Sequence, residues 1–412
     1  MKSNTGTGRL RRIAHLRAAK GRGKRRGGSR RSVGGANRLQ LLTLLIAGMP
    51  GLAALAALLF TWQDVRIAEQ GHITSRFNDA ISNLGSTSLD VRFGGIYALE
   101  RLMQDSARDQ PRTISVLSAY VRQHARVPKS GFAKEDESLE EQDKIEPATD
   151  ITAVMNVLAD RTPDRDGRAQ LDWTRADLRG LQLSAWTFKE AAKIERSGDV
   201  PDTRVPFSWA ALGGADLRHA ALGGVDLHNA ILVDANLHDT FLQHSDLSHA
   251  VLEGANLNFA HLAETDLTGA DLNWANLREV DASSGGNNFT NATLVGADMT
   301  RAGLDGANLT NAKLVEANLT GAQLIGANLH GAKLSTADKA LKDEFGPFEK
   351  DANANLADAD LEGADLTNAD LRGVDFSRAN LMYADLTGAK LTGVKLTGAK
   401  LHGVRGLPPS LR

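Results

Sequence analysis

The chain has 412 residues, a formal net charge of −2 and no cysteine. The lack of cysteine excludes disulfide bonds, thiolate metal sites and a cysteine nucleophile, and the length indicates two or three folding units. The charges are unevenly spread, because residues 1–63 contain 13 Lys and Arg but no Asp or Glu. The remaining residues carry 35 cationic against 50 acidic side chains, a net charge of −15.

The N-terminal segment combines a basic tail with a long apolar run. Residues 1–38 are rich in Arg, Lys, Gly and Ser, which is too polar for a core, so we expect a disordered tail. Leu39–Phe60 follows as 22 residues without a charge, which is long enough to span a bilayer. We therefore predict a transmembrane helix over residues 39–62. Its tail would lie in the cytoplasm against anionic lipid headgroups, with the rest of the chain outside.

Other interpretations of this segment stay open. A cleaved signal peptide would normally have a shorter basic region and a small-residue cleavage site. A re-entrant hairpin turning at Met49–Gly51 would return the body to the cytoplasm, although each arm would then have only about ten residues. The tail is also compatible with nucleic acid, but its position beside an apolar run favours the membrane.

Residues 63–128 predict a small helical domain, because apolar residues recur every three or four positions. Gly94 and Gly95 are interpreted as a close helix contact, since the spaced glycines, lysine and preceding strand of a phosphate-binding loop are missing. The first helical stretch has its apolar positions at Ile73, Phe77, Ile81 and Leu84. Further helices are expected over Leu89–Asp105, from Pro111 onward with Ile114, Leu117 and Val121 on one face, and over Asp150–Ala159.

From Phe207 to Leu401 the sequence repeats every five residues, with the unit Ala-Asp/Asn-Leu-x-x. A fixed period marks a repeat architecture, and five residues fits neither the helical nor the strand period. A chain that turns a corner every five residues closes a four-sided coil, which advances by about one inter-strand spacing, roughly 4.8 Å. Leu and the small Ala then point inward, and the other three positions are expected to face solvent.

The array has faults and interruptions that the pattern must accommodate. We expect Ser283–Asn288 to bulge outward by two extra residues, and Ala337–Ala352 to leave the wall as a loop or short helix. Lys189–Arg204 separates the main array from leading units, and we interpret Leu171–Phe188 as a cap. Larger or polar residues replace the inward Ala at Val205, Val225, Val280, Val374, Val394, Thr240, Ser245, Thr265 and Asn287.

The repeats closely resemble those of the pentapeptide-repeat family. The resemblance implies an all-β right-handed quadrilateral β-helix, the pentapeptide-repeat solenoid, preceded here by one transmembrane helix and a small helical domain. The stretch VRFGGIYALERLMQDS (residues 91–106) is similar to a region before the repeats in bacterial membrane-anchored pentapeptide-repeat proteins. The expected parts are a tail 1–38, the transmembrane helix 39–62, the helical domain 63–128, a charged linker 129–147, a short helix and connector 148–170, cap repeats and an insertion 171–204, the β-helix 205–404 with excursions at 283–288 and 337–352, and a tail 405–412.

The sequence contains no evident catalytic arrangement. Residues 20 positions apart should stack in neighbouring coils, and no two histidines of the array's cluster differ by 20, so we predict no metal site. No catalytic residue and no cofactor is predicted, and the binding residues and oligomeric state stay unknown. The clustered histidines are His219, His228, His238, His244, His249 and His261.

The combined prediction is a non-enzymatic scaffold at the cell membrane. The single-pass protein would display its β-helix outside the cytoplasm to bind a protein or a surface polymer. Some pentapeptide-repeat proteins resemble duplex DNA and protect or inhibit DNA gyrase, so a DNA-mimicking regulator of gyrase or topoisomerase is the alternative. An inverted topology would instead make the chain a membrane regulator that faces the cytosol. Asp360, Asp365, Asp370 and Asp375 form an acidic run on four successive sides, but Asn and Lys dilute it elsewhere.

Overall fold

The computed structural model describes residues 54–63 without 56, 71–128, 146–183, and 205–411 without 284, 338 and 346–351. The chain divides into two compact units, Met1–Gln70 and Gly71–Arg412. In the first unit the described residues are helical and expose Leu58, Phe60 and Trp62. Across the described part of the chain, no helix is both long enough and apolar enough to cross a membrane.

Several sequence-based predictions fall wholly or largely outside the described residues. They concern the basic tail 1–38, the transmembrane helix 39–62, the charged linker 129–147 and the insertion at Lys189–Arg204. Only the end of the predicted transmembrane helix, from residue 54, is described, and it is helical. These four segments therefore stay predictions.

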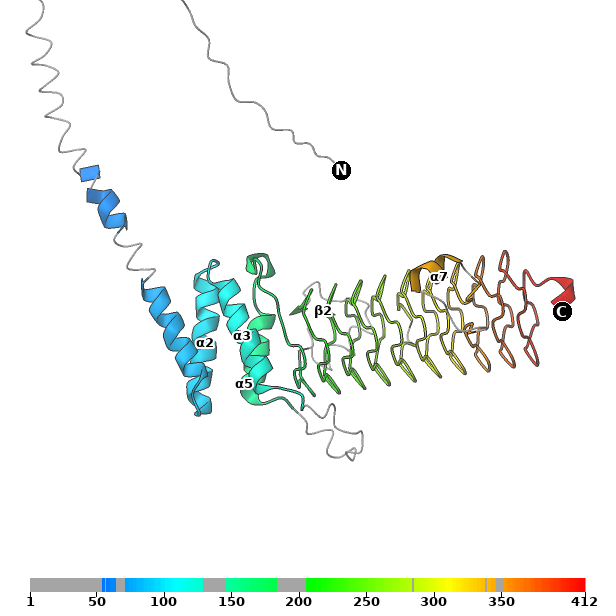
Figure 1. Ribbon diagram of the computed structural model, residues 1–412, viewed down its shortest axis with the longest axis horizontal. Coiled ribbons are helices and arrows are strands. Elements are labelled where there is room, and N and C mark those ends of the chain that lie inside the picture. The colour runs from blue at the N-terminus through cyan, green and yellow to red at the C-terminus, as the bar shows by residue number, and fades with distance from the viewer. Residues whose placement is uncertain are drawn as a thin grey trace, which may run out of the picture. The chain divides into compact units, whose positions relative to one another are not determined.

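Helices form the N-terminal part of the second unit (Figure 1). A helical stretch over residues 71–84 precedes α2 (Leu89–Asp105), α3 (Gln110–His124) and α5 (Thr149–Ala159). Helix α5 packs against both α2 and α3, so it belongs to the same bundle although the linker precedes it. Apolar positions with helical spacing meet in the centre of the bundle. The fully buried ones include Ile96, Leu99, Ile114, Leu117, Val154 and Leu158.

A close backbone contact corrects one detail of the expected pattern. The pattern places Ile81 on the buried side of its helix, but Ile81 is 39% exposed and Ala80 is buried instead. A Cβ on Gly95 of α2 would lie 2.7 Å from the Ala80 carbonyl oxygen, so the two helices touch at this point. Gly95 is therefore the packing residue that the sequence predicts, whereas Gly94 has open space around it.

The described residues between 205 and 405 form a four-sided β-helix, a rod of stacked coils interrupted by α7 (Lys339–Phe345) (Figure 1). Its first coil contributes β1 (Val205–Pro206), which pairs in parallel with β2 (Val225–Asp226) of the next coil. Elsewhere single residues 20 positions apart form parallel bridges, so backbone groups are satisfied by the neighbouring coils. We number the faces in chain order by the ladder residue of this first coil: face 1 through Pro206, face 2 through Ala211, face 3 through Asp216 and face 4 through Ala221.

Leu and Ala fill the interior of the rod, as the five-residue pattern predicts. Leu309 and Ala307 of one unit have no exposed surface, and each buried Leu contributes roughly 1.5–3 kcal/mol before the loss of chain entropy. Where a hydroxyl replaces the inward Ala, it finds an acceptor in the coil before. The Thr240 hydroxyl donates to the Leu217 carbonyl oxygen at 2.9 Å, so the fault leaves no unpaired polar group in the core.

Two interruptions shift the register of the ladders. Asp266 pairs with Asn288, 22 positions later instead of 20, so two extra residues leave the wall. The sequence predicts this shift, but Asn287 is buried within the wall, and the bulge is shorter than expected. Asn318 pairs with Asn355, 37 positions later.

The longer interruption carries a helix. Its 17 extra residues, the excess of that 37-position spacing over 20, include α7 (Lys339–Phe345). Glu344 of α7 binds Lys313 Nζ at 2.6 Å, which attaches the helix to face 2. Figure 1 shows α7 beside the coils of the rod. The rod continues to Arg405 and ends in a short helical turn, η2 (Pro409–Leu411).

Residues 171–183 form an incomplete coil between the bundle and the rod. Asp172 pairs with Ala211 in a parallel bridge, while Arg126 after α3 forms an antiparallel bridge with Ala176. Arg161 lies at the junction, after α5 and before η1 (Pro163–Arg165). The buried apolar residues of the bundle and of the rod form one continuous core.

Candidate functional site

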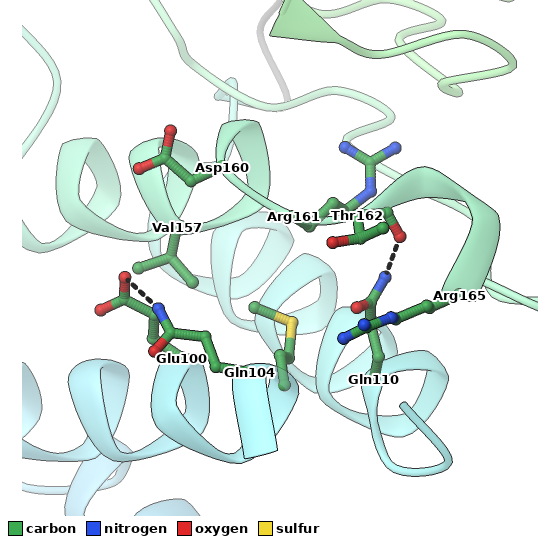
Figure 2. Close-up of a pocket in the computed structure, with 9 residues that line it drawn as sticks. Glu100, Gln104, Gln110, Val157, Asp160, Arg161, Thr162 and Arg165 are labelled. Carbon is green, nitrogen blue, oxygen red and sulfur yellow. Dashed lines mark hydrogen bonds between the residues drawn. The ribbon is translucent and has the colours of Figure 1, made fainter. Parts of the chain in front are cut away.

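A cavity of about 200 Å³ lies in the helical bundle beside the end of α5 (Figure 2). Its polar groups bond to one another, since Gln110 Nε2 donates to the Thr162 carbonyl oxygen at 2.6 Å and Gln104 Nε2 to Glu100 at 3.4 Å. Arg161 on its wall is engaged in an ion pair and in main-chain hydrogen bonds. This cavity therefore lacks the converging acid and base that general acid–base catalysis requires.

Perturbed pKa values in the bundle have a structural cause. Asp150 of α5 is 3% exposed and accepts hydrogen bonds from Arg92 Nε at 2.8 Å and Tyr120 Oη at 2.5 Å. Burial alone would raise the pKa of Asp150, but the bonds from Tyr120 and Arg92 outweigh it and lower the pKa. Burial and the bond to Asp150 raise the pKa of Tyr120 to about 12. Because the three residues come from α2, α3 and α5, the group joins these helices.

Ser248, His228 and Asp246 meet near the edge between faces 1 and 2, but they do not form a catalytic triad. The Ser248 hydroxyl donates to Asp246 Oδ1, and His228 Nδ1 lies 2.8 Å from the same Ser248 Oγ. Because the hydroxyl has one proton, the histidine donates to this oxygen. A hydrolytic triad needs the reverse, a histidine that accepts the serine proton and is oriented by the carboxylate.

The histidines of the rod come closer together than the sequence predicts. His219 and His238 have ring centroids 5.9 Å apart, and His228 and His249 are 5.7 Å apart. These pairs are 19 and 21 residues apart, so they do not meet the expectation that only residues 20 apart stack. Each turn has two residues at the corner, and either can contact either corner residue of the next coil. Among the described residues, no group of three or more His, Cys, Asp or Glu is arranged to hold a metal ion.

Asp239 lies between histidines of two other coils. His219 Nδ1 is 2.9 Å from Oδ2 of Asp239, and His261 Nε2 is 3.4 Å from Oδ1. The bonds from His219 and His261 hold the pKa of Asp239 well below its ordinary value, and the bond to Asp239 raises the pKa of His261. His261 also stacks on Phe241 with a centroid separation of 4.6 Å. This cluster therefore ties three coils together through groups that titrate.

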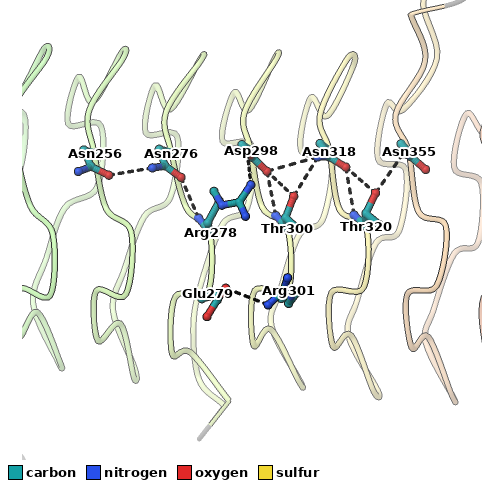
Figure 3. Close-up of polar contacts among 10 residues, drawn as sticks. All are labelled: Asn256, Asn276, Arg278, Glu279, Asp298, Thr300, Arg301, Asn318, Thr320 and Asn355. Atoms are coloured by element: carbon teal, nitrogen blue, oxygen red, sulfur yellow. Dashed lines mark hydrogen bonds and ion pairs between the residues drawn. The ribbon is translucent and has the colours of Figure 1, made fainter. Parts of the chain in front are cut away.

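Polar residues of face 3 bond to one another along the rod (Figure 3). Asn276 Nδ2 donates to Asn256 Oδ1 at 2.9 Å, and Asn318 Nδ2 donates to Thr300 Oγ1 at 2.9 Å. At the neighbouring edge Arg301 pairs with Glu279 of the preceding coil at 3.3 Å (Figure 3). These polar groups are used largely within the fold.

The expectation that the ladder positions all face solvent is wrong at two carboxylates. Asp216 is 3% exposed and binds Arg218 through two hydrogen bonds of 2.9 and 2.8 Å. Asp370 is 1% exposed and accepts hydrogen bonds from Arg372 and Lys390. A cation two residues later in the turn or one coil away compensates each buried charge, and the five-residue pattern does not report it.

The edges of the rod carry exposed aromatic side chains that sequence reasoning missed. Each turn places the second residue after the central Leu at positive φ, where Gly is favoured. Trp209, Phe259, Trp274 and Tyr383 occupy this position with φ between 55 and 63°, and all four are exposed. The Trp274 ring lies over Gly296 of the next coil, where a Cβ would be 2.6 Å from it. The same turn position elsewhere holds Gly, Asn, Asp and charged residues, so a bulky aromatic side chain there is a departure from the pattern.

Comparisons with known proteins agree with this architecture. The pentapeptide-repeat family model matches in 8 copies, within residues 210–281, 302–338 and 352–405. HetL, a pentapeptide repeat protein involved in heterocyst differentiation regulation from the cyanobacterium Nostoc sp. strain PCC 7120, is 30% identical. The match covers 57% of this chain and 90% of HetL, with a TM-score of 0.27.

Other solved structures and the curated proteins add less. Rfr23 from the cyanobacterium Cyanothece 51142 is 26% identical over 33% of this chain and 89% of its own, with a TM-score of 0.20. QnrB1, a plasmid-mediated fluoroquinolone resistance protein, is 16% identical over 46% of this chain and 83% of its own, with a TM-score of 0.26. No curated protein gives a significant match. On the strength of its repeats and their ladder register, the chain belongs to the pentapeptide-repeat family.

Proposed function

We propose that this protein is a non-enzymatic, membrane-anchored scaffold that binds a protein or a surface polymer along the walls of its β-helix. The main support is that the interior of the rod is filled by Leu and Ala, while exposed aromatic residues stand on its edges. A filled rod offers its surface rather than an enclosed pocket, and rigid surfaces of this kind suit recognition. The catalytic alternatives lose support from the proton arrangement at Ser248 and His228.

The membrane anchor in this proposal rests on the sequence. Leu39–Phe60 would span the bilayer with the basic tail 1–38 inside and the β-helix outside the cytoplasm. The test is membrane fractionation with alkaline extraction, combined with added protease in intact cells. We expect the full chain to stay in the membrane pellet and its body to be cleaved from outside. If the part of the chain after the transmembrane helix is protected from protease until the cells are lysed, the predicted orientation is wrong. If alkali releases the protein from the membrane, the predicted anchor is wrong.

Binding by the walls is tested by photo-crosslinking in cells. A photoreactive amino acid is placed at one exposed position on each wall or edge, for example at Ile231, Phe259 and Ile325, which are 48%, 43% and 45% exposed. We expect crosslinks to a distinct partner from one side and none from the others. Absence of crosslinks from every side would contradict the scaffold proposal.

A DNA-mimicking regulator of gyrase or topoisomerase is the second candidate. Asp226, Asp246 and Asp266 stack in successive coils of face 1 and give a regular row of carboxylates. Asn288 and Asn308 continue the row without charge, which weakens the likeness to a phosphate backbone. The test is a gyrase supercoiling assay with the purified full chain. Inhibition at stoichiometric concentrations would favour this function over the scaffold.

A further inference from the structure

Face 2 is half-exposed along its first coils, and α7 is attached to it further along. Its ladder begins with Ala211, Ile231 and Val251, and the Ile231 side chain is 48% exposed. The same ladder later reaches Lys313, where α7 is attached. One face of the rod therefore serves as a helix-docking surface at one end and presents an apolar floor at the other.

The way α7 is held shows what face 2 requires of a helix. The Glu344 carboxylate binds Lys313 Nζ at 2.6 and 2.8 Å, and the same ammonium lies 5.2 Å from the centroid of the Phe345 ring. Leu341 of α7 is buried to 3% exposure. The helix thus contributes an apolar residue and a carboxylate, and the rod contributes the cation.

The first coils of face 2 offer the opposite charge. Asp234 and Glu253 lie at the edge toward face 3, beside Ile231 and Val251, and both side chains are exposed. Within the described part of the chain they form neither a hydrogen bond nor an ion pair with another side chain. A cation brought to this edge would therefore meet carboxylates that the fold has left unpaired.

Two tryptophans border the same apolar floor. Trp209 stands at the edge toward face 1 and Trp274 at the edge toward face 3, with exposures of 65% and 56%. Both have positive φ, and the units on either side of Trp274 along the face 2–3 edge use Gly254 and Gly296 at this position. Tryptophan is the aromatic residue most favourable for contact with Lys or Arg, and it is enriched at the centres of protein interfaces.

We propose that face 2 from Ala211 to Asp271 binds an amphipathic helix of a partner protein that carries Lys or Arg along one margin of its apolar stripe. This inference rests on the proposed scaffold function and names its surface and partner chemistry. The four ladder residues span three inter-coil steps, roughly 14 Å, which corresponds to about ten residues of helix. The anchors on such a helix would recur with the spacing i, i+3 or i+4, and i+7.

The test uses the full chain in nanodiscs of neutral lipid. The probe is a synthetic 14-residue amphipathic helix of Leu and Lys with a central photoreactive residue, and its Leu and Glu counterpart is the control peptide. Crosslinked residues are mapped by mass spectrometry, and the yield is measured against peptide concentration, with empty nanodiscs as background. We expect crosslinks around Ile231 and Val251 with the Lys peptide and far fewer with the Glu peptide.

Variants make the inference falsifiable. Ile231→Ser on face 2 should weaken binding of the Lys peptide by about tenfold. Ile325→Ser, at a similarly exposed position on the edge between faces 4 and 1, should leave this binding unchanged. The double variant Asp234→Lys, Glu253→Lys should weaken binding of the Lys peptide to a similar extent and strengthen binding of the Glu peptide. Both substituted acids are exposed, so folding should be retained, which circular dichroism checks.

Three outcomes would overturn the inference. They are crosslinks spread evenly over all four faces, a yield that neither variant changes, and crosslinks from face 2 to a second copy of the chain instead of the peptide. If the crosslinking in cells still finds a partner on another face, only this inference falls and the scaffold function stands.

Discussion

The first and the last coils of the rod share one core but differ in their walls. Residues 205–281 contain 11 Asp and Glu, two Arg and six His, whereas residues 355–405 contain seven Asp and Glu, and six Lys and Arg. Central Leu residues within both regions, such as Leu247 and Leu366, have no exposed surface, whereas Leu391, Leu396 and Leu401 in the last coil are only partly buried. Apart from this partly exposed last coil, the difference lies in the walls rather than in the packed interior.

The last coils neutralise their carboxylates internally. Lys390 lies 3.2 Å from Asp370 of the preceding coil, and Lys395 lies 3.4 Å from Asp375. In the first coils Asp216 is paired with Arg218, but other carboxylates meet histidines, as Asp239 does, or are left open to solvent, as Asp234 is. Because each coil contacts only its neighbours, a single fold can carry one wall whose carboxylates pair with Lys and Arg and another whose carboxylates meet histidines or solvent.

The largest expected effect tests whether the core is equivalent in both regions. Leu247→Asp and Leu366→Asp each bury a carboxylate at a position without exposed surface, so each should cost about 5 kcal/mol or more. Ile325→Asp is the control, because Ile325 is 45% exposed and should lose less than about 1 kcal/mol. Urea unfolding followed by circular dichroism measures the losses. Tolerance at one of the two Leu positions would show that the cores are not equivalent.

A pair of aspartates separates the two wall types. Asp370→Ala in the last coils removes the partner of Arg372 and Lys390 and should cost about 2 kcal/mol. Asp234→Asn in the first coils removes the charge of an exposed carboxylate without a side-chain partner, keeps a residue type that tolerates the positive φ of this turn, and should change stability by less than about 0.5 kcal/mol. Thermal unfolding of both variants measures the difference. Similar losses would contradict the view that a carboxylate paired with cations supports the fold, whereas one left open to solvent does not.

The sequence predicts those features of the fold that depend only on the five-residue period of the repeat. A five-residue unit on four sides requires bridges between residues 20 apart, and Asp216 with Asn236 confirms it. The two extra residues before Asn288 also follow from counting, and the bounds of α2 follow from helical spacing and turn residues.

What the period does not determine is how side chains meet across an edge. The contact of His261 with Asp239, 22 positions earlier, depends on the direction of corner side chains. The exposed Trp209 could have been noticed as a bulky residue at the turn position where the repeats often have Gly. Ile81 was misassigned because the approach of two backbones at Gly95, rather than apolarity, selects the buried side.

The cluster around Asp239 should make the first coils sensitive to pH. The raised pKa of His261 contributes stability that is fully present below its ordinary value of 6.5 and is lost as the pH rises through the raised value. The lowered pKa of Asp239 contributes stability above the ordinary carboxyl value of 3.8, and this is lost only in stronger acid. His261→Gln should therefore lower the melting temperature most near pH 5 and least near pH 8.5.

The size of this effect is limited by solvent, because the His261 side chain is 32% exposed, and we expect less than about 1 kcal/mol. Differential scanning calorimetry of the two proteins across this pH range measures it. In a protein that already carries Asp239→Asn, the change in melting temperature caused by His261→Gln should no longer depend on pH. A dependence that persists without the Asp239 carboxylate would assign it to another group.

The smallest expected effect concerns the backbone strain at the exposed aromatic residues. Trp209 has a φ of 63° and is 65% exposed. Trp209→Gly removes the strain of a side chain in the left-handed region, which costs about 1–2 kcal/mol. It also gives the unfolded chain more conformational freedom, which lowers stability by about 0.5–1 kcal/mol. The net change should lie between zero and a gain of about 1 kcal/mol, as measured by urea unfolding. Leu212→Gly, in the buried interior of the same coil, should instead be strongly destabilising. A clear loss of stability in Trp209→Gly would mean that the tryptophan supports the fold. A neutral or stabilised variant that no longer binds its partner would mean that the strain is retained for recognition.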